Sequence, residues 1–169
     1  QESTGASFIG GLSGTLQNLS IHGKIVASGA RNSVVGYADA QSLVSNVHSY
    51  LEIDATKMKS NDTGGVIGSL GVGAEVDRCS FSGTLTVSGN SYDGFGGVVG
   101  WTNSGRITNC ANYGTLTCTG LAKCELGGIV GGISSKDFYK FSHNLNVGSV
   151  TNTAANPLYT NALIGHLTK

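Results

Sequence analysis

Residues 96–118 contain three short motifs: Gly96-Gly97-Val98-Val99-Gly100-Trp101, then Arg106-Ile107-Thr108-Asn109-Cys110, and then Tyr113-Gly114-Thr115-Leu116-Thr117-Cys118. One repeat earlier the same motifs occur in the same order, as Gly64-Gly65-Val66-Ile67-Gly68-Ser69, Glu75-Val76-Asp77-Arg78-Cys79 and Ser82-Gly83-Thr84-Leu85-Thr86-Val87. A short unit that recurs at a nearly fixed interval indicates a repeat protein, in which each copy is stabilised by the copies beside it.

The first motif, two apolar residues followed by glycine, recurs along the whole chain. Its copies are Phe8-Ile9-Gly10, Val34-Val35-Gly36, Val66-Ile67-Gly68, Val98-Val99-Gly100, Ile129-Val130-Gly131 and Leu163-Ile164-Gly165. Successive glycines are 26, 32, 32, 31 and 34 residues apart. These intervals lie in the window of about 20 to 50 residues that is typical of stacked repeats.

The second motif is a pair of residues three positions apart, both expected to point inward. The pairs are Leu16 and Leu19, Val44 and Val47, Val76 and Cys79, Ile107 and Cys110, and Phe141 with Asn144. A spacing of three fits neither a continuing helix nor a strictly alternating strand, so it predicts a corner. The residues expected at the corner are Asn18, Asn46, Arg78, Asn109 and His143. Asparagine tolerates the left-handed backbone conformation that a corner often requires.

The third motif alternates apolar and polar residues, as a half-buried strand does. The predicted inward residues are Ile25 and Ala27, Ile53 and Ala55, Leu85 and Val87, Leu116 and Cys118, and Val150. The predicted outward residues are Lys24 and Val26, Glu52 and Asp54, Thr84 and Thr86, Thr115 and Thr117, and Ser149 and Thr151. Each repeat therefore supplies three short β segments.

These patterns predict an all-β fold: a single parallel β-solenoid domain over residues 1–169, with about five coils and three short strands in each coil. We expect it to be right-handed, because parallel crossovers generally are. Only residues 37–51 have mild helical potential, enough for a short turn before the strand in that stretch, and residues 57–63 and 152–161 are expected to be loops.

Composition excludes several classes of protein. Glycine occurs 27 times without a three-residue period, and charged residues make up only 12%, which suits a weakly charged extracellular β protein. Ten Lys and Arg balance ten Asp and Glu, so no nucleic-acid partner is expected, and no apolar run is long enough to span a membrane. Since the chain starts at Gln1 without a Met or a signal peptide, we expect a processed or excised segment with flanking domains.

The Gly-apolar-apolar-Gly motif, with the corner and the Gly-Thr-Leu-Thr strand that follow it, resembles the GLUG-motif repeats. The matching segments are Gly65-Val66-Ile67-Gly68, Gly97-Val98-Val99-Gly100 and Gly128-Ile129-Val130-Gly131, and degenerate copies are Ser33-Val34-Val35-Gly36 and Ala162-Leu163-Ile164-Gly165. The family occurs in secreted or surface-anchored bacterial proteins, including adhesin-like proteins and non-catalytic regions of some immunoglobulin A proteases. The resemblance implies a surface location and a stalk or adhesive role, and it supplies no catalytic residues.

Five aromatic residues are candidates for ligand contact on corners or loops: Trp101, Tyr92, Phe95, Tyr113 and Tyr139. Aromatic faces serve as platforms for sugar rings and are enriched at protein interfaces. Residues 92–95 and 121–126 are the loops expected to carry such contacts. The alternative for Trp101 is that its ring packs over the edge of a coil.

Other arrangements have less support. A threonine ladder formed by Thr84, Thr86, Thr115 and Thr117 could bind ice, but Glu52 and Asp54 interrupt it in a neighbouring coil. Asp77 and Arg78 form a close acid-base pair at a corner, which a solvated ion pair explains. Neither metal nor cofactor is predicted, because no cluster has ligand spacing.

The four cysteines leave two candidate disulfides open. Cys79 and Cys110 occupy matching inward positions in adjacent coils, within reach of each other. Cys118 and Cys124 flank a short loop and are a comparable candidate.

From these observations we expect a non-enzymatic rigid spacer of a bacterial surface or secreted protein. If it binds anything, we expect host glycans or extracellular proteins. The alternatives are a polysaccharide-active solenoid enzyme and, with less support, an ice-binding protein.

Overall fold

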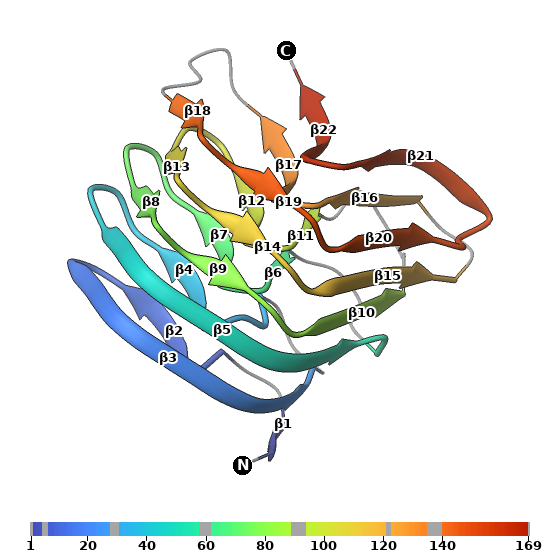
Figure 1. Cartoon of the computed structure of the whole chain (residues 1–169), viewed down its shortest axis with the longest axis horizontal. Coiled ribbons are helices and arrows are strands. Elements are labelled where there is room, and N and C mark those ends of the chain that lie inside the picture. The colour runs from blue at the N-terminus through green and yellow to red at the C-terminus, as the bar shows by residue number, and fades with distance from the viewer. Residues whose placement is uncertain are drawn as a thin grey trace.

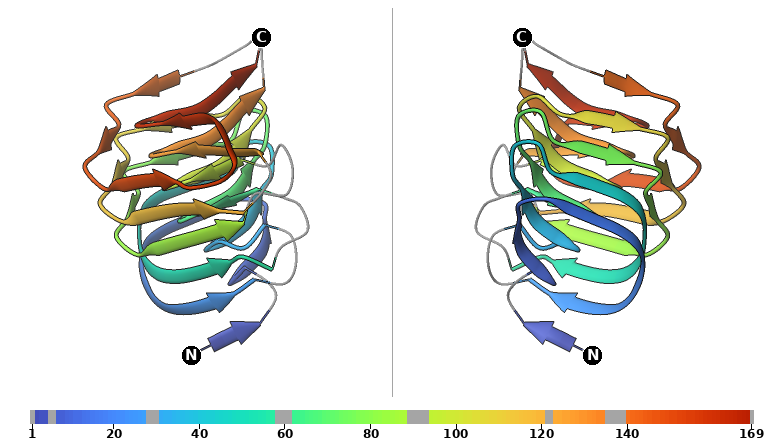
Figure 2. Two further views of the ribbon diagram at one scale, coloured as in Figure 1. Left: turned by 90° about the vertical axis from the view of Figure 1, so that its right-hand side faces the viewer. Right: turned by 90° about the vertical axis from the view of Figure 1, so that its left-hand side faces the viewer.

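The computed structural model describes residues 2–4, 7–27, 31–57, 62–88, 94–120, 123–134 and 140–168. In this part of the chain every regular element is a strand, and the strands form three sheets. All pairings between these strands are parallel, as in β3 with β5 and β10 with β15. Coils therefore lie one on another from the N-terminal to the C-terminal end (Figure 1 and Figure 2). The predicted parallel β-solenoid is confirmed, while its handedness and coil number stay predictions.

The largest sheet has twelve strands and carries the second and third sequence motifs. Its strands are β1 (Glu2–Thr4), β3 (Thr15–Val26), β5 (Leu43–Ala55), β8 (Glu75–Asp77), β9 (Ser80–Phe81), β10 (Thr84–Ser88), β13 (Arg106–Thr108), β14 (Ala111–Asn112), β15 (Thr115–Thr119), β18 (Lys140–Ser142), β19 (Leu145–Asn146) and β20 (Ser149–Asn152). The register places Ile53, Leu85 and Leu116 in one row, as the alternating pattern predicts.

A six-stranded sheet carries the first motif. Its strands are β2 (Ile9–Leu12), β4 (Val35–Ala38), β7 (Ile67–Leu70), β12 (Val99–Thr102), β17 (Val130–Ser134) and β22 (Ile164–Thr168). Each strand pairs through the same motif position, so that Ile67, Val99 and Val130 are neighbours. Residues 37–51 belong to β4, a turn and β5, so the expected turn before the strand is present and no helix forms there: β-branched residues and the stacked coils favour strand.

A four-stranded sheet lies beside the six-stranded one and was not predicted from the sequence. Its strands are β6 (Thr63–Gly64), β11 (Gly94–Gly96), β16 (Lys123–Gly127) and β21 (Asn156–Asn161). The expectation of a loop over residues 152–161 is therefore wrong, because β21 pairs with β16 there. Of the other expected loop, residues 58–61 lie outside the described part of the chain.

The glycine that ends each copy of the first motif allows the six-stranded and four-stranded sheets to touch through their backbones. A Cβ at Gly100, on β12, would lie 2.5 Å from the carbonyl oxygen of Gly68 and 2.6 Å from the amide nitrogen of Thr63 in the four-stranded sheet. Gly131 and Gly165 have the same kind of backbone neighbours. Glycine follows the apolar pair because no side chain fits between the two sheets.

The five predicted corner residues all adopt the left-handed conformation. Their φ angles are 58° for Asn18, 53° for Asn46, 52° for Arg78, 55° for Asn109 and 56° for His143. Three of the five are asparagine, the residue type that tolerates this conformation best after glycine.

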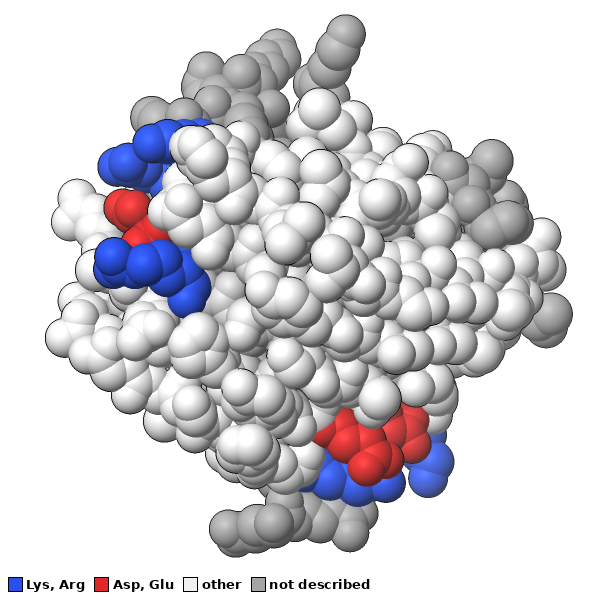
Figure 3. All heavy atoms as spheres, in the orientation of Figure 1, with Lys and Arg blue, Asp and Glu red and all other residues white. Residues whose placement is uncertain are grey.

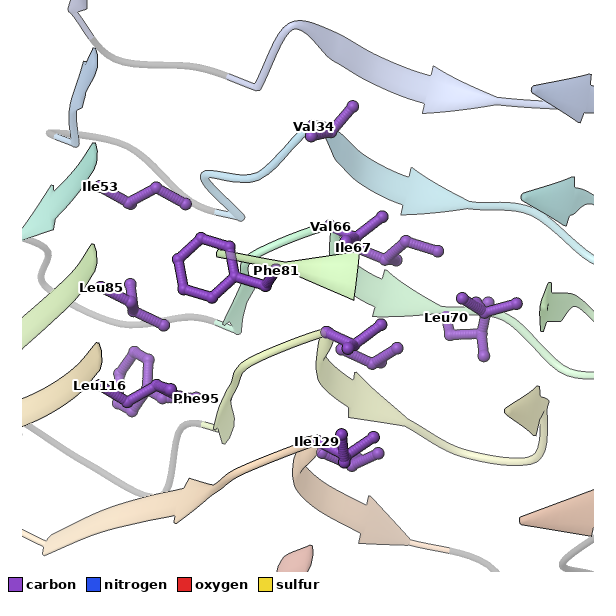
Figure 4. Packing of buried hydrophobic residues seen from close by; sticks show 14 of the residues in the cluster. Val34, Ile53, Val66, Ile67, Leu70, Phe81, Leu85, Phe95, Leu116 and Ile129 are labelled. Carbon is purple, nitrogen blue, oxygen red and sulfur yellow. The ribbon is translucent and has the colours of Figure 1, made fainter. Parts of the chain in front are cut away.

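The core is a continuous stack of aliphatic, aromatic and thiol side chains between the sheets. Val34, Val66 and Ile129 lie above one another on one side, and Ile53, Leu85 and Leu116 lie opposite them (Figure 4). All six side chains are at most 1% exposed. One repeat cannot bury its own apolar face, so the stack itself supplies the burial that stabilises each coil.

Candidate ligand-binding surface

An open hollow lies on the outer surface of the twelve-stranded sheet, beside the bend that leads into β10 and β15. It has a volume of about 550 Å³ and spans three successive coils. The lining residues are Tyr50, Leu51, Glu52, Ser82, Gly83, Thr84, Tyr113, Gly114 and Thr115. Two outward rows of side chains therefore border the hollow, with the backbone of Gly83 and Gly114 between them.

One of these rows consists of five residues at equivalent positions of the register, and we call it the aromatic row: His22, Tyr50, Ser82, Tyr113 and Val147. His22 pairs with Tyr50 in the β3–β5 register. The amide of Ser82 donates to Ser49 O, that of Tyr113 to Phe81 O and that of Val147 to Asn112 O, at 2.8, 2.8 and 3.0 Å. These backbone bonds hold the row in register along the solenoid.

The rings at the start of the aromatic row face along the stack. His22 and Tyr50 have ring centroids 4.5 Å apart and planes only 2° from parallel. Since the two residues belong to adjacent coils, one face of Tyr50 lies against His22 and the other face is directed toward the next coil. That next coil contributes Ser82, which has no ring, and the following coil contributes Tyr113. Tyr50 and Tyr113 are 44% and 54% exposed.

The hollow keeps its depth because its floor admits no larger side chain. A Cβ on Gly83 would collide with the carbonyl oxygen of Leu51, and a Cβ on Gly114 would collide with that of Gly83 and with the Phe81 ring. Glycine at these positions is thus required by the close backbone approach at the bend.

The second row at the hollow is polar and carries one carboxylate. Thr84 pairs with Glu52 on one side and with Thr115 on the other. The Glu52 carboxylate accepts a hydrogen bond from Lys24 Nζ at 2.7 Å, and both side chains are about half exposed. The rim of the hollow therefore offers hydroxyl groups and one carboxylate that is already paired with a lysine.

Charged groups on this face gather away from the middle. Figure 3 shows acidic and basic side chains in two groups at opposite corners, with uncharged side chains between them. Lys24, Glu52 and Asp54 belong to one of these groups, on strands β3 and β5. Thr56 donates its hydroxyl and its amide hydrogen to Asp54, and these bonds hold the pKa of Asp54 below its usual value. The middle of the face therefore carries little charge to attract a polyelectrolyte.

No protein-family model, curated protein or solved structure matches this chain.

The structure separates the predicted contact residues. Tyr113 is exposed and borders the hollow. Phe95 is only 3% exposed, so the expectation that it lies at the surface is wrong; it pairs with Leu126 and joins the core. Tyr92 and Tyr139 lie outside the described residues.

Trp101 lies on a different face, in the six-stranded sheet. It is half-buried, and its ring covers Gly132, where a Cβ would collide with it. Its Nε1 donates to Asn103 Oδ1 at 3.3 Å, and Ser134 donates to the same oxygen at 2.8 Å. Trp101 therefore packs over the edge of a coil and does not meet Tyr113.

The two segments expected to form exposed contact loops, residues 92–95 and 121–126, are buried where the structure describes them. Cys124, Glu125 and Leu126 are buried in strand β16, so residues 124–126 are not the exposed loop that we expected, and residues 121–122 lie outside the described part of the chain. Gly94 and Phe95 are likewise buried in β11, because both segments are strands of the four-stranded sheet that the sequence did not predict.

Sequence reasoning missed His22 and Tyr50, although a signal was present. Tyr50 stands two residues before Glu52, just as Tyr113 stands two residues before Thr115, and His22 stands two residues before Lys24. Aligning the repeats on the outward residues of the third motif would have placed the rings in one row.

The other candidates have structural explanations. The register forms the threonine ladder from Thr84 to Thr115 and breaks it at Glu52, as the pattern predicts. At the corner, burial raises the pKa of Asp77, but hydrogen bonds from Asn109 and Thr108 and the nearby arginine charges outweigh it, so that pKa lies below its usual value. Asp77 thus serves as an acceptor that ties adjacent coils together.

The cysteines form one disulfide. Cys118 is bonded to Cys124, which links β15 to β16, whereas Cys79 and Cys110 are buried free thiols. The neighbouring Cys79 sulfur and burial raise the pKa of Cys110, so this thiol stays protonated and inert at neutral pH.

Among the described residues, no group of three His, Cys, Asp or Glu side chains could hold a metal ion. That part of the chain also contains no helix long and apolar enough to cross a membrane.

Proposed function

We propose that this chain is a non-enzymatic module of a secreted or surface-displayed bacterial protein, which acts as a rigid spacer and binds an uncharged glycan through the hollow. The observation that carries the proposal is the pair of exposed tyrosine rings, Tyr50 and Tyr113, in one row of the hollow, with hydroxyl groups in the row that faces them. The resemblance to GLUG-motif repeats supports the bacterial surface location.

Chemistry favours a sugar as the ligand. Sugar rings present apolar C–H faces and hydroxyl edges, so they need an aromatic surface beside hydrogen-bonding groups. The hollow supplies both, with Tyr50 and Tyr113 in one row and Thr84 and Thr115 in the other. The low charge of the surrounding face favours an uncharged glycan over an acidic one.

The enzyme alternative has less support at this hollow. Glycoside hydrolysis commonly requires two carboxyl groups on opposite sides of the scissile bond. Of the residues that line the hollow, only Glu52 carries a carboxylate, and Lys24 already binds it. The arrangement is better suited to holding a sugar than to cleaving one.

Screening the chain on an array of uncharged and acidic glycans tests the proposal. We expect binding to uncharged glycans, and a loss of affinity of about two- to tenfold in Tyr113→Ala, because stacking on an aromatic ring contributes about 0.5–1.5 kcal/mol. Tyr37→Ala is the matched control: Tyr37 lies in β4 of the six-stranded sheet and does not line the hollow. If the wild-type chain bound no uncharged glycan, the binding role would be wrong.

A further inference from the structure

We propose that the hollow is a slot for a single sugar ring, which enters between Tyr50 and Tyr113 and takes the place that a ring at Ser82 would occupy. This inference rests on the proposed function and specifies how the glycan is bound. The aromatic row contains rings at His22, Tyr50 and Tyr113, and Ser82 interrupts it between the last two.

The spacing of the coils determines how many rings the slot can hold. Parallel strands lie about 4.8 Å apart, so equivalent positions two coils apart are separated by about 9.6 Å. One ring in contact with both tyrosines needs about 7–8 Å between them, and two rings need about 10.5–12 Å, at about 3.5–4.0 Å for each contact. The slot therefore accommodates one ring but not two.

The same spacing favours a sugar over a flat aromatic ligand. A pyranose chair is thicker than a planar ring because hydrogens project from both of its faces. A planar ring in contact with both tyrosines needs about 7–8 Å between them, so a separation of about 9.6 Å leaves a gap of about 2 Å. The stack of His22 on Tyr50 keeps the Tyr50 face turned toward the slot, so the site is organised before the ligand arrives.

Polar groups at the slot are placed for the ring edge. The Ser82 side chain is exposed, and Thr84 lies two residues further on in the opposite row. Thr115 and the Lys24-bound Glu52 flank Thr84 in the register. Sugar hydroxyls at the edge of an inserted ring would thus meet hydroxyl and carboxylate oxygens, while both faces of the ring meet tyrosine.

Ser82→Tyr provides the decisive variant, because it supplies the missing ring from the protein itself. We expect it to fold with thermal stability equal to or above that of the wild type, since it extends the existing stack, and to lose sugar binding at least tenfold. Ser20→Tyr is the matched control, since Ser20 is exposed on the same sheet and does not line the hollow. Tyr113→Phe should bind as the wild type does, whereas Tyr113→Ala should bind about two- to tenfold more weakly.

NMR titration of the full chain measures the size of the site. The ligands are the methyl glycosides of glucose, galactose and N-acetylglucosamine and the linear trisaccharides of the same sugars. We expect monosaccharide and trisaccharide affinities within about threefold of each other for the sugar that binds. A steep gain with chain length, or undiminished binding by folded Ser82→Tyr, would overturn the slot but leave the glycan-binding role intact. Absence of binding by the wild type to every sugar and array glycan would overturn both.

Discussion

Asn109 illustrates how single residues determine the path of each coil. It lies at a corner with φ of 55°, and its side-chain amide donates to Asp77 Oδ1 at 2.7 Å in the preceding coil. Most L-amino acids lose about 1–2 kcal/mol in this backbone conformation, whereas asparagine and glycine tolerate it. The corner therefore combines a backbone requirement with a contact between coils.

We expect Asn109→Ala to lower the free energy of unfolding by about 1–2 kcal/mol, because it adds backbone strain and removes a hydrogen bond. Asn109→Gly removes the same hydrogen bond, but glycine adopts the left-handed conformation without strain. The glycine variant should therefore lose less unfolding free energy than the alanine variant. Denaturant unfolding of both variants makes the comparison. An alanine variant as stable as the glycine variant would mean that the left-handed conformation does not matter at this corner.

Sequence reasoning succeeded at the corners and failed at Phe95 for a physical reason. Asparagine recurs at the corner because few residue types fit its backbone conformation, so the pattern is visible in the sequence. Phe95 lies between glycines in a strand of three residues, where no alternation shows which face is buried. The hollow was only partly predictable: Tyr113 was identified, but Tyr50 became relevant once the register placed it beside Ser82.

At the level of elements, the contact between the six-stranded and four-stranded sheets explains the most regular feature of the sequence. The backbones of β12 and β6 approach so closely that Gly100 has backbone atoms of Gly68 and Thr63 where its Cβ would be. The four-stranded sheet could not be predicted, because strands such as β6 have only two residues. The glycines that flank it were visible, but they do not by themselves distinguish a strand from a turn.

This contact predicts different effects for the same substitution in two coils. Gly100→Ala should destabilise the protein by about 3 kcal/mol or more, since the clash is with backbone atoms that cannot move independently. Gly10 is the equivalent glycine of the first motif copy, and a Cβ there would meet nothing within 4 Å. Gly10→Ala should therefore change the unfolding free energy by less than about 0.5 kcal/mol. Similar losses in thermal or denaturant unfolding of both variants would contradict the proposed contact.

On the scale of the whole molecule, burial declines toward both ends of the stack. Val66 and Val98 are fully buried in the central coils, whereas Phe8 and Leu163, at matching motif positions in outer coils, are 44% and 39% exposed. The central strands β7 and β12 have neighbours on both sides, and β22 has one. In a stacked repeat each coil gains stability only from adjacent coils, so the ends are the least stable part.

Amide hydrogen exchange should reveal this gradient. We expect amides of β7 and β12 to exchange at least about tenfold more slowly than those of β22, because local opening of an end coil breaks one interface instead of two. Residue-resolved exchange measured by NMR at neutral pH provides the comparison. Equal protection from one end to the other would indicate that the solenoid opens only as a single cooperative unit.

The interruption of the aromatic row at Ser82 also bears on how such a protein evolves. Some serine codons differ from a tyrosine codon by one base, and the register gives successive coils an equivalent place for either residue. If the proposed slot binds a sugar, a point mutation at that place would therefore open or close it without altering the backbone. Duplication of one coil would add a further slot at a fixed distance, so a lineage of such proteins could acquire multivalent recognition by copying a segment that already folds.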